Sequence, residues 1–388
     1  MSRVSSSRRF LLWVTALTAA CSGGEPGADR AGSGDAETSA ERRALAPTDV
    51  FRIDSLAEGV WVAEVLQRPE AYAFANSLVV AGDSALLVVD TQQSPAAARA
   101  LIAWIRETFD RPVRWVVNTH FHGDHVNGNV AYRETWPEVQ FVAHASVPEA
   151  IRTEGRARIE EERSTLPATL DRRQAWLDGD TLPEGQEMTP ELRDRLAYSV
   201  RVGSAYLDEL RELEVLLPDA LVEAPRSFDL GGRSVDVVPV GPAHTAGDLV
   251  VWVPDAGVAG VGDIVEEAAP WIEGADLRGW AAALARVTAL DPGRVVPSHG
   301  SAARGRELLE GLAPLFADLV RAAEREAQTP AADGAAWPTA AAVDRVVESL
   351  APHRAFLASV GVEGTAFTEW ASEAARQALT ETERGRSR

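Results

Sequence analysis

Four side chains of types that bind metal ions lie close together, directly after a predicted strand. The strand is predicted at 113–117, which is rich in valine and contains a tryptophan. Imidazole and carboxylate groups this close to one another would stay unpaired if buried, unless a cation holds them. In an extended segment, the two histidines of a His-x-His pair point to the same side. Asp124 and His125 belong to the turn that follows and can face a second metal position. The spacing therefore predicts two metal positions, formed in part by His120, His122, Asp124 and His125.

The overall composition argues against nucleic acid as a partner. The 388-residue chain has a formal net charge of -20. It contains no lysine, so all the residues counted as Lys or Arg are arginines. Binding to DNA, RNA or an anionic membrane surface depends on positive charge that this chain lacks. A hydrophobic content of 46% supports a sizeable core, and the length suits one large domain or two ordinary ones. We expect a protein that acts on a small molecule, and the composition leaves its oligomeric state open.

The first residues have the pattern of an export signal. Arg8 and Arg9 belong to a positively charged start, and Phe10–Ala20 is an apolar run too short to span a bilayer. Residues 1–20 are therefore predicted to be a signal peptide, with a loose similarity to a twin-arginine signal. Small residues precede Cys21, the only cysteine, and the segment resembles a bacterial lipoprotein processing site. We expect export to the bacterial periplasm or cell envelope, with Cys21 as a lipid anchor to the membrane or with ordinary cleavage nearby.

Changes in composition divide the rest of the chain. Residues 21–48 are rich in Gly, Ala, Ser, Glu and Asp without apolar periodicity, which is typical of a flexible tether. In 49–328, apolar strand patterns such as Leu86–Val89 alternate with helical patterns, which predicts a layered α/β domain. A helical insertion interrupts this domain at about 146–218, either as a lid over the site or as a structural extension. A helical C-terminal extension is predicted at 329–388.

Other ligand-type residues occur at the ends of strands. Asp90 ends a central strand and is expected either to orient a metal ligand or to be an ordinary turn residue. His144 also ends a strand and is expected to have a structural role rather than to orient a ligand. His353 lies in the C-terminal helical region and is expected on the surface. Three more residues each follow an apolar strand and precede a turn, namely His244, Asp263 and His299.

These motifs and their order resemble the metallo-β-lactamase-fold hydrolase superfamily. The resemblance covers roughly residues 55–315 and implies an α/β fold, a four-layer αβ/βα sandwich with a helical insertion and a helical C-terminal tail. Any one of the later motifs alone would be weak evidence for this superfamily, but the whole set of motifs in this order is specific to it. The matching motifs are His120-x-His122-x-Asp124-His125, Gly241-Pro242-Ala243-His244-Thr245-Ala246-Gly247, Gly262-Asp263 and Pro297-Ser298-His299-Gly300.

The resemblance also implies which residues hold each metal. Two zinc ions are expected, because imidazole and carboxylate donors without cysteine suit zinc, although iron or manganese stays open. Asp263 would bridge the two ions. The first ion would be held by His120, His122 and His244, and the second by Asp124, His125 and His299.

The implied activity is hydrolysis. In an exported enzyme of this kind, a metal-bridging hydroxide would attack an ester, lactone, thioester or related bond, while Asp124 orients or shuttles the proton. A β-lactamase is one alternative, which Asp263 argues against, because the true β-lactamases of this superfamily generally lack the bridging aspartate. The other alternative is a metal-stabilised binding protein without turnover.

Overall fold

The computed structural model describes residues 46–66, 75–180, 182, 187–328 and 337–386. The predicted signal peptide 1–20 and nearly all of the predicted tether 21–48 lie outside these ranges. Residues 44–388 form one compact unit. Among the described helices, none is both long and apolar enough to cross a bilayer.

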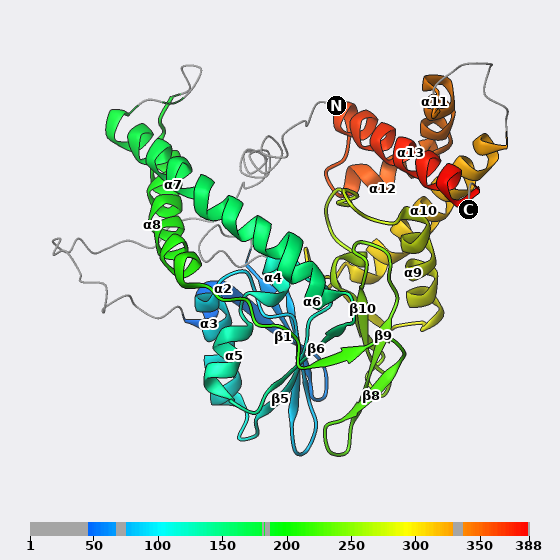
Figure 1. Ribbon diagram of the computed structural model, residues 1–388. Coiled ribbons are helices and arrows are strands. Elements are labelled where there is room, and N and C mark those ends of the chain that lie inside the picture. Colours follow the sequence, from blue (N-terminus) through cyan, green and yellow to red (C-terminus); the bar gives the residue numbers. More distant parts are fainter. Residues whose placement is uncertain (1–45, 67–74, 181, 183–186, 329–336, 387–388) are drawn as a thin grey trace. The chain divides into compact units, whose positions relative to one another are not determined.

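Two β-sheets form the centre of this unit (Figure 1). The seven-stranded sheet has the order β1-β2-β3-β4-β5-β6-β7, antiparallel from β1 to β4 and parallel from β4 to β7. The five-stranded sheet has the order β12-β11-β10-β9-β8, with β11 and β12 parallel and the other pairs antiparallel. The strands are β1 Phe51–Ala57, β2 Val60–Val65, β3 Ser77–Ala81, β4 Leu86–Val89, β5 Val113–Val117, β6 Gln140–His144, β7 Ala220–Val222, β8 Arg226–Asp229, β9 Ser234–Pro239, β10 Leu249–Val253, β11 Val258–Gly260 and β12 Arg294–Val296.

Apolar residues on both faces of the strands produce the layers. In β4, Leu86 and Val88 pack on the outer side against helices, whereas Leu87 and Val89 pack between the sheets. Helix α3 (Pro95–Thr108) begins at Ser94, whose hydroxyl accepts a hydrogen bond from the Ala97 backbone N–H at 3.1 Å. The helices over this outer face are α2 (Pro47–Val50), α3 and α5 (Asn129–Thr135).

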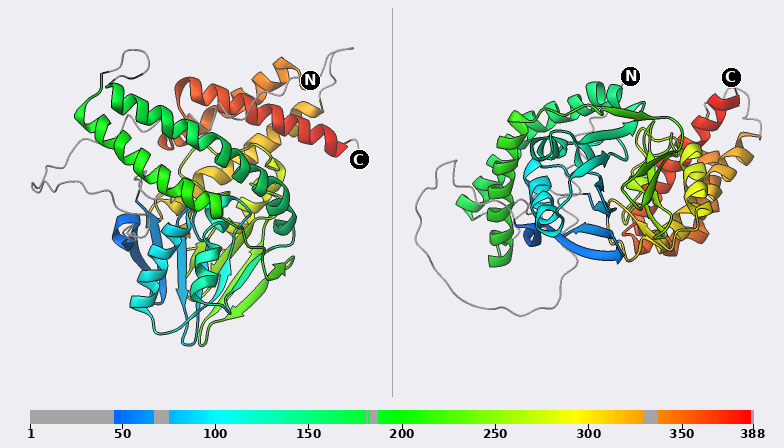
Figure 2. Two further views of the ribbon diagram at one scale, coloured as in Figure 1. Left: turned by 60° about the vertical axis from the view of Figure 1, so that its left-hand side comes forward. Right: turned by 90° about the horizontal axis from the view of Figure 1, so that it is seen from below.

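The second sheet is covered on its outer face by C-terminal helices, which share one core with it (Figure 2). Trp280 is fully buried there, and its indole N–H donates to the Ile264 carbonyl oxygen at 2.9 Å. The order helix, sheet, sheet, helix is the predicted four-layer sandwich, so the expected fold class is confirmed. The covering helices are α9 Leu277–Ala289, α10 Gly305–Ala327, α11 Ala340–Ser349, α12 Arg354–Ser359 and α13 Gly364–Arg386.

The prediction for His353 was wrong. His353 lies in the short 3-10 turn Ala351–His353 and is 9% exposed rather than on the surface. Its Nε2 atom lies 2.8 Å from Asp318 Oδ2 of α10, so a carboxylate from another helix pairs with it. The residue helps to join the C-terminal helices to α10.

The helical insertion after β6 contains two long helices. It consists of α6 (Val147–Ala150), a π-helical turn (Ile151–Gly155), α7 (Arg156–Gly179) and α8 (Pro190–Glu212). Buried residues near the base of this pair form a small core with Val130 of α5, and they include Ile159, Tyr206 and Leu210. The base of the insertion is therefore packed against the sandwich.

Candidate metal centre

All seven predicted ligand residues converge where strands end at one edge of the sandwich. Gly262 has a φ of 57°, and a Cβ atom there would lie 2.8 Å from Thr119 Oγ1. Only glycine therefore lets the turn after β11 approach the loop of residues 119–125, called the histidine loop below, this closely. His120 and His122 follow β5, Asp124 and His125 lie in α4 (Gly123–Val126), His244 follows β9, Asp263 lies in the 3-10 turn Gly262–Ile264 after β11, and His299 follows β12.

The first group of donor atoms consists of three imidazole nitrogens and one carboxylate oxygen. His122 Nδ1 lies 2.9 Å from His120 Nε2 and 3.2 Å from His244 Nε2. Asp263 Oδ2 lies 3.6 Å from both His120 Nε2 and His244 Nε2. These four donors surround a single point.

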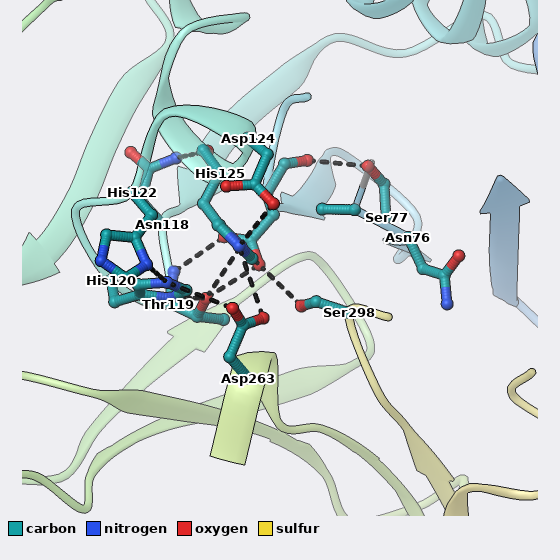
Figure 3. Close-up of polar contacts among 12 residues, drawn as sticks. Asn76, Ser77, Asn118, Thr119, His120, His122, Asp124, His125, Asp263 and Ser298 are labelled. Atoms are coloured by element: carbon teal, nitrogen blue, oxygen red, sulfur yellow. Dashed lines mark hydrogen bonds and ion pairs between the residues drawn. The ribbon is translucent and has the colours of Figure 1, made fainter. Parts of the chain in front are cut away.

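The second group lies beside the first and contains Asp124, His125 and His299. Asp124 Oδ2 lies 3.4 Å from His125 Nε2 and 3.2 Å from His299 Nε2. Asp263 presents its other oxygen here, because Oδ1 lies 3.4 Å from both His125 Nε2 and His299 Nε2. Figure 3 shows Asp263 facing the histidine loop from the opposite side. One carboxylate therefore directs one oxygen to each group.

The spacing of these atoms fits divalent metal ions. With zinc–nitrogen distances of about 2.0–2.1 Å, neighbouring ligand atoms in a tetrahedron are roughly 3.4 Å apart. The distances within the two groups, from 2.9 to 3.6 Å, are close to that edge length. Buried His125 Nε2 and Asp263 Oδ1 form no hydrogen bond with any described residue. A cation between such atoms would satisfy both.

Burial keeps the histidines of the first group neutral. It is the largest cause that lowers the pKa of His120 and His122 well below the ordinary value, and the neighbouring histidines lower these values further. Burial lowers the pKa of His244 as well. Neutral imidazole is the form that binds a metal ion, so the first group is prepared for a cation at neutral pH.

The second group has a more negative environment. Burial alone would raise the pKa of Asp263, but His299, His125 and His120 outweigh it and hold the value well below its usual range. Burial likewise would lower the pKa of His125, but Asp124, Asp263 and Asp90 raise it well above its usual value. The carboxylates here therefore favour a positive charge, which a divalent ion would supply.

Asp90 holds several parts of the centre together. It is 1% exposed and has a φ of 60° after β4. Its Oδ2 atom lies 2.8 Å from His125 Nδ1 and accepts a hydrogen bond from Thr119 Oγ1 at 2.8 Å, while Oδ1 accepts from the Thr119 N–H at 2.8 Å. Ser298 Oγ donates to Asp90 Oδ2 at 3.4 Å. Asp90 therefore contacts two of the loops that carry candidate ligands, the one with His120 to His125 and the one with His299.

Replacement of Asp90 by asparagine should reduce metal affinity or turnover by about 10–100-fold, because groups that orient a ligand have effects of that size. An amide has only one oxygen and cannot accept from Thr119 and His125 as the carboxylate does. The measurement is metal affinity by competition with a chelator. Asp110→Asn is the control, since the Asp110 side chain is 95% exposed. Equal affinity in the two variants would show that Asp90 is only a turn residue.

Other polar residues position the loops without contributing to either donor group. The Asn76 amide donates to the carbonyl oxygens of Pro297 at 2.9 Å and Gly300 at 2.8 Å, and so braces the loop of His299. The Asn118 amide donates to the His125 carbonyl oxygen at 2.6 Å. Asn118 was not singled out from the sequence. His144 pairs with Ser146 at 2.9 Å and belongs to neither group.

The chain is similar to a known enzyme at low sequence identity. The chain is 25% identical over 246 residues to the linear primary-alkylsulfatase of Pseudomonas sp. (strain ATCC 19151). The match covers 61% of this chain but only 43% of that relative's length.

Two solved structures are similar at low identity. A metallo-beta-lactamase from Pontibacter korlensis has 18% identity and a TM-score of 0.47, and the match covers 69% of this chain and 99% of that one. The metallo-beta-lactamase FIM-1 from Pseudomonas aeruginosa in its mono-zinc form has 20% identity and a TM-score of 0.46, with 69% and 95% covered. A family model described as the metallo-beta-lactamase superfamily matches residues 73–299. Because this match covers more than half of the sequence, the chain belongs to the metallo-beta-lactamase superfamily.

Proposed function

We propose that this chain is an exported hydrolase that uses two metal ions, most suitably zinc, on an ester, lactone, thioester or related bond. The observation that carries the proposal is the Asp263 carboxylate, whose two oxygens face different donor groups at 3.4 and 3.6 Å. His120, His122 and His244 would hold one ion. Asp124, His125 and His299 would hold the other.

The metal ions, when bound, would polarise the bond under attack and make water a nucleophile at neutral pH. The protein residues give the centre a closed and an open side. His120, His125 and His244 are buried, whereas the side chains of Asp124 and His299 are 18% and 21% exposed. A substrate would therefore enter beside Asp124. From that position, Asp124 can orient the attacking water and hold its proton.

The relative in Pseudomonas adds sulfate esters to the candidate substrates. Its name describes it as an alkylsulfatase, and the similarity includes 61% of the present chain. A lactam is a weaker candidate, because Asp263 supplies the carboxylate that the true β-lactamases of the superfamily generally lack.

A substrate panel tests the proposal directly. The zinc-loaded protein would be assayed with a 4-nitrophenyl ester, a lactone, a thioester, an alkyl sulfate and a cephalosporin. We expect turnover of at least one ester-type substrate, loss of that turnover with a chelator and recovery with zinc. Metal-loaded protein that turns over none of them would support the binding protein without catalysis.

We also propose that the protein is exported and tethered by Cys21. Support comes from Arg8, Arg9, the apolar run Phe10–Ala20 and the position of the single cysteine. In a bacterial host, the wild-type chain should fractionate with membranes, whereas Cys21→Ala should appear in the soluble exported fraction. If the wild-type protein is also soluble, the lipid anchor is wrong, and if it remains in the cytoplasm, export is wrong too.

A further inference from the structure

Arg158 lies on α7 in the helical insertion, on the same helical face as a residue anchored near the metal centre. Glu162 is one turn further along α7, and residues four apart lie on the same face of a helix. Glu162 Oε2 accepts hydrogen bonds from Tyr206 Oη at 2.8 Å and from Gln93 Nε2 at 3.3 Å. Gln93 Nε2 also donates to Tyr206 Oη at 2.6 Å. This buried network attaches α7 to the loop after β4.

The same network touches the loop of candidate ligands. A Cβ atom at Gly123, between His122 and Asp124, would lie 2.9 Å from Gln93 Oε1. On the other side of Arg158, a Cβ atom at Gly155 would lie 3.9 Å from Phe121 Cδ2. The start of α7 therefore lies along the loop of candidate ligands, with contacts near Gly155 and at Glu162, and Arg158 lies between these two positions on α7.

The positive charge of Arg158 acts on Glu162. Burial raises the pKa of Glu162, and Arg158 opposes this while Asp124 adds to it. Arg158 is exposed, and it forms no hydrogen bond or ion pair with any residue in the described ranges. Its guanidinium is thus available to a ligand.

We propose that Arg158 binds an anionic group of the substrate, a sulfate or a carboxylate, beside the metal centre. A guanidinium presents several N–H donors in a plane and matches the oxygens of such groups. The proposal rests on the proposed hydrolase function, and it makes Arg158 a specificity residue. In a chain of net charge -20, an exposed arginine at this position would let the site select anions that the rest of the surface repels.

The test compares two esters of equal length, neutral 4-nitrophenyl hexanoate and anionic 4-nitrophenyl hydrogen adipate, on the zinc-loaded full chain. Arg158→Gln should lower the ratio of kcat/KM for the anionic ester to that for the neutral ester by about tenfold, mainly through KM. Arg158→Lys should recover part of that ratio. The control is Arg156→Gln, two positions earlier and therefore on another side of α7, which should leave the ratio unchanged. An unchanged ratio in Arg158→Gln, or an equal change in Arg156→Gln, would overturn the proposal.

A binding measurement separates this proposal from the hydrolase function. If neither ester is hydrolysed, the proposed function fails for esters, and calorimetry with hexyl sulfate still tests Arg158. We expect about tenfold weaker binding by Arg158→Gln than by the wild type and Arg156→Gln. Equal affinity in all three proteins, or no binding by the wild type, would contradict anion recognition at Arg158.

Discussion

Asp263→Ala should lower the affinity for the second metal ion more than for the first, and turnover should fall at least about 10–100-fold. The first group would keep three imidazoles after this change, whereas the second would keep two imidazoles and Asp124. The variant would also leave His125 and His299 without the carboxylate oxygen that lies 3.4 Å from each. Removing a ligand that both ions share should reduce metal affinity and turnover at least as much as removing a group that only orients a ligand.

The matched control for this variant is Asp255→Ala. Asp255 lies between β10 and β11, close in sequence to Asp263, but its side chain is 52% exposed and pairs with Arg233. Metal content and turnover on the best panel substrate would be measured for both variants. If Asp263→Ala binds two ions and turns over normally, Asp263 is not a bridge.

Replacing both His120 and His122 by alanine should have the largest effect on the first group. Two of its three imidazoles would be lost, and the two atoms concerned lie only 2.9 Å apart in the native site. When metal is supplied in a stoichiometric amount, we expect the first ion to be lost and turnover to fall more than roughly 100-fold. Removing each ligand should reduce metal affinity or turnover at least as much as removing a group that only orients a ligand. Elemental analysis of the folded protein measures the occupancy.

His144→Ala is the histidine control for that experiment. His144 is the last residue of β6, a parallel strand of the first sheet, but its ring contacts Ser146 and belongs to neither donor group. It should therefore keep both ions. If the double variant retains as much metal as His144→Ala, the first group does not bind metal.

The fold and the centre differed in how much of each was evident from the sequence. The strands and helices around the site follow local apolar patterns and caps, such as Ser94 before α3, so they could be predicted. The first metal motif lies within one loop and was equally evident. The order of strands could not be read from local patterns, and β1 (Phe51–Ala57) was missed, because its alternation is interrupted by exposed polar residues.

Contacts between distant segments explain what the sequence did not predict. His353 lies in a polar helical region, but Asp318 on another helix pairs with it, so its burial depends on how the helices pack. The network of Gln93, Glu162 and Tyr206 joins positions as far as 113 residues apart. None of these residues belongs to a recognisable motif, and only the packing of the insertion brings α7 against the loop after β4.

The central claim is a centre of two metal ions, and the zinc content of the folded wild-type protein tests it most directly. The protein would be loaded with zinc, freed of loosely bound metal by gel filtration and analysed by mass spectrometry of the elements. The arrangement of the seven donor residues around Asp263 predicts two zinc equivalents per chain. One equivalent or none in correctly folded protein would contradict it.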